Sequence, residues 1–176
     1  MIKKLYVKLI IGAIYADPKW LIKAKSLMQK KSWEIEHQSK IFPFDQTDYY
    51  FSEMGEGLKR CFLSIKGLQN LELSSDWKEK TINIEDKLSN RGKRRINLDP
   101  GYLDLSRVVL LSEKEGSHKI YLRNGVWADL VLLKDKGGYR NFPWTFPDIK
   151  TGRYDDFFLQ LRAEFKKEKS LGCING

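Results

Sequence analysis

The sequence predicts an α+β protein with a ferredoxin-like split β-α-β sheet, extended by a C-terminal β-hairpin and a closing helix. The first observation is the order strand-helix-strand-strand-helix-strand between residues 4 and 99, which is typical of that unit. The second is Asn124-Gly125 between two alternating apolar runs, a strong hairpin signal. The third is an apolar stripe that begins at about Tyr154 and predicts a last helix.

The first strand is predicted over residues 4–15, which are apolar and rich in β-branched side chains. The same segment imitates a secretory signal peptide, because it starts with basic residues and ends in small ones. We favour the strand, since Lys8 interrupts the apolar run. The helix start Asp17-Pro18 also follows at once.

The remaining elements follow from apolar periodicity and from the positions of capping and turn residues. We expect strands at 34–44, 58–65, 93–99 and 108–111, a loop or short helix at 45–57, and a helix from Ser74 or Ser75 to 88. No interdomain linker is evident, so we expect one domain over 1–176, with its core at about 4–168 and a flexible tail at 169–176.

The stretch 93–102 carries the most informative polar pattern. On a strand, Arg95, Asn97 and Asp99 would point to one face. Pro100-Gly101 suits the centre of a type II turn. Arg95 could grip a phosphate or carboxylate, Asn97 could orient a ligand and Asp99 could act as a base. Alternatively, Asp99 satisfies turn amides and pairs with Arg95.

The predicted hairpin brings together a second pair of functional candidates. A type I′ turn at Asn124-Gly125 places Leu122 opposite Trp127 and makes His118 and Asp129 diagonal neighbours on one face. An imidazole held by a carboxylate is suited to general acid–base chemistry. The alternative is a polar pair that only closes the mouth of the hairpin.

Two further segments carry candidate ligand-binding residues. Asp45, Tyr49 and Glu53 follow the second strand and could form a lid over a pocket, although they also suit a capped helical turn packed on the sheet. Trp144 lies in a Pro- and aromatic-rich loop at 137–152, where it could stack on a nucleobase. Such aromatic residues between prolines more often clamp a loop to the core.

Composition limits the classes of function. The chain has 41% hydrophobic and 31% charged residues and a net charge of +9, which favours anionic partners. Cys61, in an apolar run, is expected to be buried; with Cys173 and no C-x-x-C it fits a reducing cytoplasm. Two histidines at this spacing exclude a zinc cluster, and we assign no metal-binding residues. No segment after the first strand has the length of a membrane span.

Several blocks resemble a bacterial family of unknown function, number forty-four sixteen in the domain-of-unknown-function series. The blocks are Phe42–Tyr50, Glu53–Gly55, Arg95–Leu103, His118–Leu122 and Trp144–Asp148. Asp129 stands where a Glu is common in that family, and Phe146 where a Tyr is common. Some relatives carry the label of GTP-binding protein, but the chain has neither a G-x-x-x-x-G-K-[ST] loop nor a G-x-G-x-x-G turn.

We therefore expect a polar pocket that binds an anionic, phosphate-bearing small molecule, in an enzyme or a binding domain. Asp99 or His118 would be the acid–base residue, Arg95 the anion clamp, and Asn97, Tyr102 and Asp129 would complete the lining. The alternatives are a non-catalytic module for single-stranded RNA or other nucleic acid, and a scaffold for protein contacts. The sequence specifies no cofactor and no oligomeric state.

Overall fold

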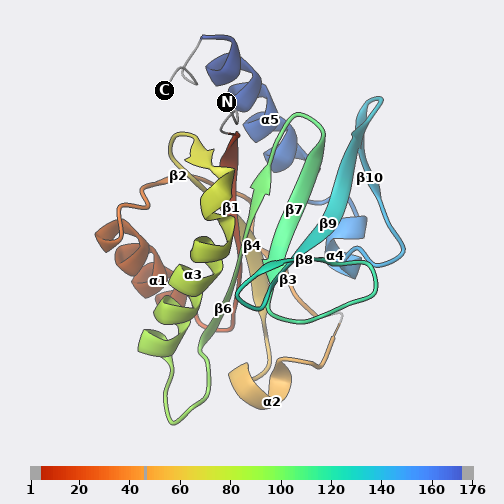
Figure 1. Cartoon of the computed structure of the whole chain (residues 1–176). Coiled ribbons are helices and arrows are strands. Elements are labelled where there is room, and N and C mark those ends of the chain that lie inside the picture. Colours follow the sequence, from red (N-terminus) through yellow and green to blue (C-terminus); the bar gives the residue numbers. More distant parts are fainter. Residues whose placement is uncertain (1–4, 46, 172–176) are drawn as a thin grey trace.

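The structure is a computed structural model and describes residues 5–45 and 47–171. These residues form ten strands in one sheet and five α-helices, in an α+β arrangement (Figure 1). The helices are α1 (Pro18–Lys30), α2 (Phe51–Met54), α3 (Ser74–Leu88), α4 (Pro147–Lys150) and α5 (Asp155–Ser170). None of them has the length and apolar character needed to cross a lipid bilayer.

The sheet is antiparallel and larger than the predicted unit. Its main path runs β10-β9-β7-β6-β1-β4-β2, and the short strands β3, β5 and β8 pair with β4, β1 and β9. The strands are β1 (Tyr6–Tyr15), β2 (Ile35–Gln38), β3 (Phe42–Pro43), β4 (Lys59–Ile65), β5 (Gln69–Asn70), β6 (Ile96–Leu103), β7 (Arg107–Ser112), β8 (Ile120–Arg123), β9 (Val126–Asp135) and β10 (Gly138–Asn141).

The first strand, β1, lies at the centre of the sheet, between β6 and β4. Leu9 and Ile11 pack in the core that also holds residues of α1 and α3, whereas Ile10 packs with residues of α4 and α5. Figure 1 shows α1 and α3 on one side of the sheet. Burial on both faces explains the continuous apolar run, so the strand interpretation is confirmed.

Lys8, which interrupts this run, serves to attach α5 to the sheet. Its ammonium is 0% exposed and donates to Glu36 Oε2 at 3.1 Å and to Glu168 Oε1 at 2.6 Å. Helix α5 therefore extends to Ser170, into the segment expected to be a tail. The remaining tail residues 172–176, with Cys173, lie outside the described residues, as does the predicted strand start at Lys4. Cys61 is a buried free thiol, as expected.

The predicted turn at Pro100-Gly101 is wrong, because both residues lie inside β6. The ladder between β6 and β7 begins at Gly101, which pairs with Leu110. A Cβ atom at residue 101 would lie 2.1 Å from the backbone oxygen of Val109. The glycine is thus required by the close approach of a neighbouring strand and not by a turn.

The hairpin prediction is confirmed in its turn and corrected in its register. Asn124 and Gly125 both have positive φ angles, 52° and 75°, as a type I′ turn requires. The register shifts between Tyr121 and Arg123, so Trp127 pairs with Tyr121 and not with Leu122. A β-bulge of this kind inserts one residue into one strand, which periodicity alone does not reveal.

We predict that Gly101→Ala lowers the free energy of unfolding by at least ~2 kcal/mol, because two backbones would have to move apart to admit the methyl group. Chemical denaturation monitored by circular dichroism measures this. Gly138→Ala is the matched control, since Gly138 is also in a strand and its Cβ would have no neighbour within 4 Å. Equal stability of the two variants would contradict the account of Gly101.

Candidate functional site

A cavity of about 410 Å³ lies where β6 and β7 separate. Strand β6 contributes Asn97 and Asp99 to its wall, and β7 contributes Leu110, Leu111 and Ser112. These β6 residues precede the three residue pairs that join the two strands. The other lining residues are Phe44, Thr47, Tyr49, Tyr50, Lys78, Arg94, Glu113, Lys114, Lys119, Asp129, Phe146 and Pro147.

The separation of the strands is stabilised by α3. The backbone N–H of Leu98 donates to Glu85 Oε1 at 2.5 Å, and its carbonyl accepts from Lys78 Nζ at 3.2 Å. Neither backbone group of Leu98 is therefore left without a partner where the β6–β7 ladder is missing. Lys78 and Glu85 are both buried, although they are charged residues of a helix.

A chain of polar contacts follows the β6 side of the cavity. Glu53 accepts from Arg94 through both carboxylate oxygens, at 2.8 Å each. Arg94 Nη1 donates to Asn97 Oδ1 at 2.7 Å, and Asn97 Nδ2 donates to Asp99 Oδ2 at 2.7 Å. Lys78 Nζ donates to Asp99 Oδ1 at 3.3 Å. The fork from Arg94 lowers the pKa of the Glu53 carboxyl.

Arg94, not Arg95, is the arginine that lines the cavity with Asn97 and Asp99. The expected alternation fails because β6 begins only at Ile96 and the backbone bends at residue 95. Strand periodicity does not extend through a bend. The run of basic residues before the strand gave no signal that separates the two arginines.

The predicted proximity of His118 and Asp129 is confirmed, with Nε2 and Oδ1 3.5 Å apart. Asp129 lines the cavity. His118 contacts Asp129 but is not itself a lining residue. Burial raises the pKa of the Asp129 carboxyl, and the nearby His118 and Lys119 oppose that increase. Oδ1 of Asp129 is buried and has no hydrogen-bond partner among the described residues.

Aromatic stacking fixes the position of His118. Its ring stacks on Trp144 with centroids 5.1 Å apart, and Trp144 stacks on Phe142 at 4.8 Å. Trp144 Nε1 donates to the carbonyl of Leu130 at 2.9 Å. Trp144 therefore clamps its loop to β9, which is the alternative role expected for an aromatic residue between prolines.

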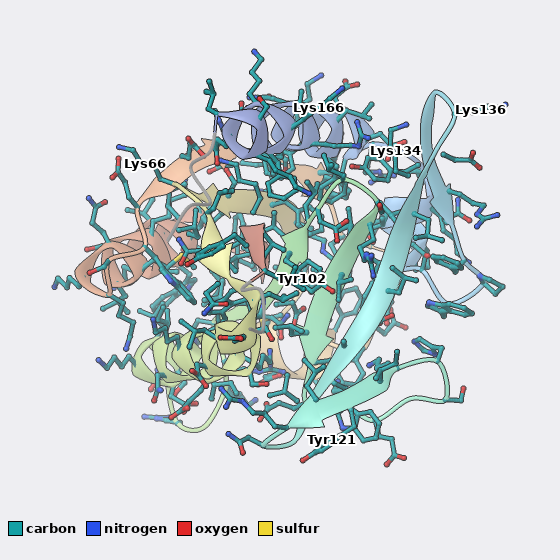
Figure 2. All side chains as sticks on the ribbon, turned by 45° about the horizontal axis from the view of Figure 1, so that its top comes forward. Lys66, Tyr102, Tyr121, Lys134, Lys136 and Lys166 are labelled. Atoms are coloured by element: carbon teal, nitrogen blue, oxygen red, sulfur yellow. The ribbon has the colours of Figure 1, made fainter. Side chains whose placement is uncertain are left out.

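The other predicted site residues are divided between the cavity and the rest of the molecule. Tyr49 lines the cavity, and its hydroxyl accepts a hydrogen bond from Lys114 Nζ. Glu53 does not line the cavity, but it forms an ion pair with Arg94, which does. Asp45 lies at a separate small hollow beside α2. Tyr102 packs against the α1 and α3 side of the core and does not line the cavity (Figure 2).

A buried guanidinium lies behind the aromatic wall of the cavity. Arg60 is 0% exposed and donates through Nη1 to both oxygens of Asp148, at 3.0 and 3.2 Å. Its Cζ lies 4.8 Å from the ring centre of Phe146 and 5.3 Å from that of Phe44. Both rings also line the cavity, so this cation–π contact supports its wall.

The functional candidates that periodicity missed are Lys78, Glu85, Lys114 and Lys119. The two on α3 had a usable signal, because Lys78 and Glu85 each neighbour a residue of the predicted apolar stripe. Charged helix residues are normally assigned to the solvent-exposed face, so the periodicity did not identify Lys78 and Glu85 as buried. Lys114 and Lys119 lie between β7 and β8, where no periodic pattern places side chains.

One cluster outside the cavity has side chains that can bind a cation. Ligand atoms of Glu36, His37 and Glu164 lie within 4.8 Å of one another. However, His37 Nε2 is already 3.1 Å from Glu164 Oε2, and the ammonium of Lys8 binds Glu36. The cluster is thus compensated by protein cations and hydrogen bonds.

The expected family resemblance is supported by a match over most of the chain. The model of a family described as "Domain of unknown function (DUF4416)" matches residues 5–165. The chain belongs to this family. All lining residues of the cavity fall inside the part that matches DUF4416. No curated protein and no solved structure matches the chain.

The buried carboxyl behind β6 predicts a pH dependence of stability. Burial raises the pKa of Glu85 from 4.5 to about 7. The unfolded chain therefore loses this proton at lower pH than the folded protein does. The free energy of unfolding should fall as pH rises from about 4.5 to 7. We expect Glu85→Gln to remove roughly 1–3 kcal/mol of that decrease.

Urea denaturation at a series of pH values measures the effect. The exposed neighbour Asp86, changed to Asn, is the matched control. A Glu85→Gln profile parallel to that of the wild-type protein would show that this carboxyl does not hold its proton in the folded state.

Proposed function

We propose that the protein binds a small anionic, phosphate-bearing molecule in the cavity between β6 and β7. The main supporting observation is the state of Lys114 and Lys119, which line it. Lys119 Nζ donates to Ser112 Oγ at 3.3 Å and to the carbonyl of Lys114 at 3.0 Å, and Lys114 Nζ contacts the hydroxyl of Tyr49. Neither ammonium forms an ion pair within the described ranges, so both can bind an anion.

The other cations of the lining are less suited to this role. Arg94 is held by Glu53 in a bidentate ion pair, and Lys78 is paired with Asp99. Their charges are compensated before any ligand arrives. The anion subsite is therefore expected at the loop between β7 and β8.

The size and the walls of the cavity favour a small molecule over a polymer. Its volume of about 410 Å³ lies within the usual range for ligand pockets. The lining also contains the aromatic rings of Phe44, Tyr50 and Phe146, which are apolar where the lysines are charged. These rings can pack on the carbon skeleton of a ligand. The basic residues Lys66, Lys134, Lys136 and Lys166 lie at the periphery of the molecule in Figure 2, and none of them lines the cavity.

Acid–base chemistry remains part of the proposal. Of the two predicted catalytic residues, Asp99 has both oxygens engaged, by Asn97 and Lys78. His118 is joined to the cavity through Asp129. The pair of His118 and Asp129 is therefore better placed than Asp99 to exchange a proton with a ligand.

One observation supports the alternative of a single-stranded nucleic-acid-binding module. Phe142, Trp144 and His118 form a continuous stack, and Trp144 is 39% exposed. Such a stack can extend onto a nucleobase. We rank the nucleic-acid-binding function second, because the indole of Trp144 already donates to the carbonyl of Leu130 and already stacks on the rings of Phe142 and His118.

We also propose a ferredoxin-like unit for part of the sheet and a cytoplasmic location for the protein. We assign β6, β1, β4 and β2 to a ferredoxin-like unit, supported by their order in the sheet and by α1 and α3, which make its two connections. The cytoplasmic location is supported by Cys61, a buried free thiol.

Propyl phosphate is a suitable first probe, because it joins a phosphate to a short apolar chain. We expect it to bind the wild-type protein, and we expect Lys114→Ala and Lys119→Ala each to weaken binding about tenfold through loss of a charge-assisted contact. Isothermal titration calorimetry at low salt measures the affinities, and thermal melting verifies that the variants are folded.

Lys136→Ala is the matched control, because Lys136 is an exposed lysine between β9 and β10, away from the lining (Figure 2). Absence of binding to the wild-type protein would refute the proposal. Equal binding to the wild-type protein and to a variant lacking both lysines would refute the assigned subsite.

A further inference from the structure

We propose that Asp129 binds a hydroxyl group of the ligand, so that the ligand is a phosphate ester that also carries a hydroxyl. This inference rests on the proposed function and defines the second half of the same cavity. Asp129 is 4% exposed and lies on β9 opposite Leu110 of β7, which also lines the cavity. Its carboxylate is thus presented to the interior by two paired strands.

The hydrogen-bonding state of Asp129 indicates a missing donor. Oδ1 is buried and accepts no hydrogen bond from any described residue. The imidazole Nε2 of His118 lies 3.5 Å away, which is outside good hydrogen-bond distance. Buried carboxylate oxygens are normally satisfied, because an unsatisfied one loses its hydration without compensation. A donor from a bound molecule would supply the bond.

The carboxylate on the β6 side of the cavity differs in this respect. Asp99 accepts from Asn97 at 2.7 Å and from Lys78 at 3.3 Å, so its two oxygens are already engaged. Asp129 therefore has a buried oxygen to offer, which Asp99 does not. The imidazole beside Asp129 is restrained, because the stack of Trp144 on His118 limits how far it can move.

The charges around Asp129 favour a neutral donor over a cation. His118 lies beside it, and Lys119 is close enough to oppose the increase in its pKa. A ligand ammonium at Oδ1 would be repelled by the ammonium of Lys119, whereas a hydroxyl adds a hydrogen bond and no charge. Because Lys119 also lines the cavity as one of the two proposed phosphate-binding lysines, one molecule that carries both a phosphate and a hydroxyl fits this site.

Glycerol 3-phosphate and propyl phosphate provide a matched test, since they share a three-carbon chain and a phosphate and differ in two hydroxyls. We expect the wild-type protein to bind glycerol 3-phosphate at least about tenfold more tightly. Asp129→Ala should abolish this preference, so that the variant binds the two ligands about equally tightly. Calorimetry measures both ligands.

Two further variants keep the test interpretable. Asp129→Asn retains the size of the side chain, so it replaces Asp129→Ala if the latter does not fold, and it should reduce the preference. Asp135→Asn alters an exposed carboxylate on the same strand and should retain the full preference. A preference near one in the wild-type protein, or one that survives in both Asp129 variants, would overturn the inference.

Two additional probes separate this inference from the proposed function. Glycerol alone should shift the NMR signal of the His118 ring in the wild-type protein and not in Asp129→Ala. A response to glycerol without binding of propyl phosphate would refute the phosphate site alone. Binding of propyl phosphate without a response to glycerol or a preference for glycerol 3-phosphate would refute the role of Asp129 alone. Tighter binding of 3-aminopropyl phosphate would show that Asp129 takes a cation and not a hydroxyl.

Discussion

The two hydrogen bonds from α3 to the backbone of Leu98 are the constraint on which the cavity depends. A strand in the middle of a sheet normally pairs on both sides, and an unpaired N–H or C=O in the interior is costly. Glu85 and Lys78 satisfy both groups of Leu98 and so allow β6 to run apart from β7 before Gly101. An opening between neighbouring strands thereby becomes a stable part of the fold.

Placing two charged side chains behind β6 has consequences for the rest of the polar wall. Lys78 also binds Asp99, and Glu85 Oε2 lies 3.6 Å from Arg94 Nη1. Arg94 in turn is oriented by Glu53. Cationic and carboxyl groups therefore alternate along this wall, and each is already engaged with another group of the protein. The groups left for a ligand are on the opposite wall, formed by β9 and by the loop between β7 and β8.

Local sequence patterns predicted correctly those features that depend on local interactions. The apolar run of β1 and the positive φ angles of Asn124 and Gly125 follow from burial and turn chemistry, and both were predicted correctly. Pro100-Gly101 suggests a turn from sequence alone. The structural reason for the glycine is the nearby backbone oxygen of Val109, on a strand whose position the local sequence does not reveal. Arg95 was chosen over Arg94 because the bend before β6 has no signature in the residue pattern.

The position of His118 and Asp129 shows how an irregularity in a strand can serve a site. The register of β7 and β9 shifts so that Val131 is an extra residue, next to Leu130. Trp144 Nε1 and Thr145 Oγ1 donate to the carbonyls of Leu130 and Val131, at 2.9 and 2.6 Å. The bulge therefore anchors the loop whose indole stacks on His118. Because His118 lies in the loop between β7 and β8, its link to the sheet is this indole, which is bound to β9. The stack thereby restrains the imidazole beside Asp129, as a binding or proton-exchanging group requires.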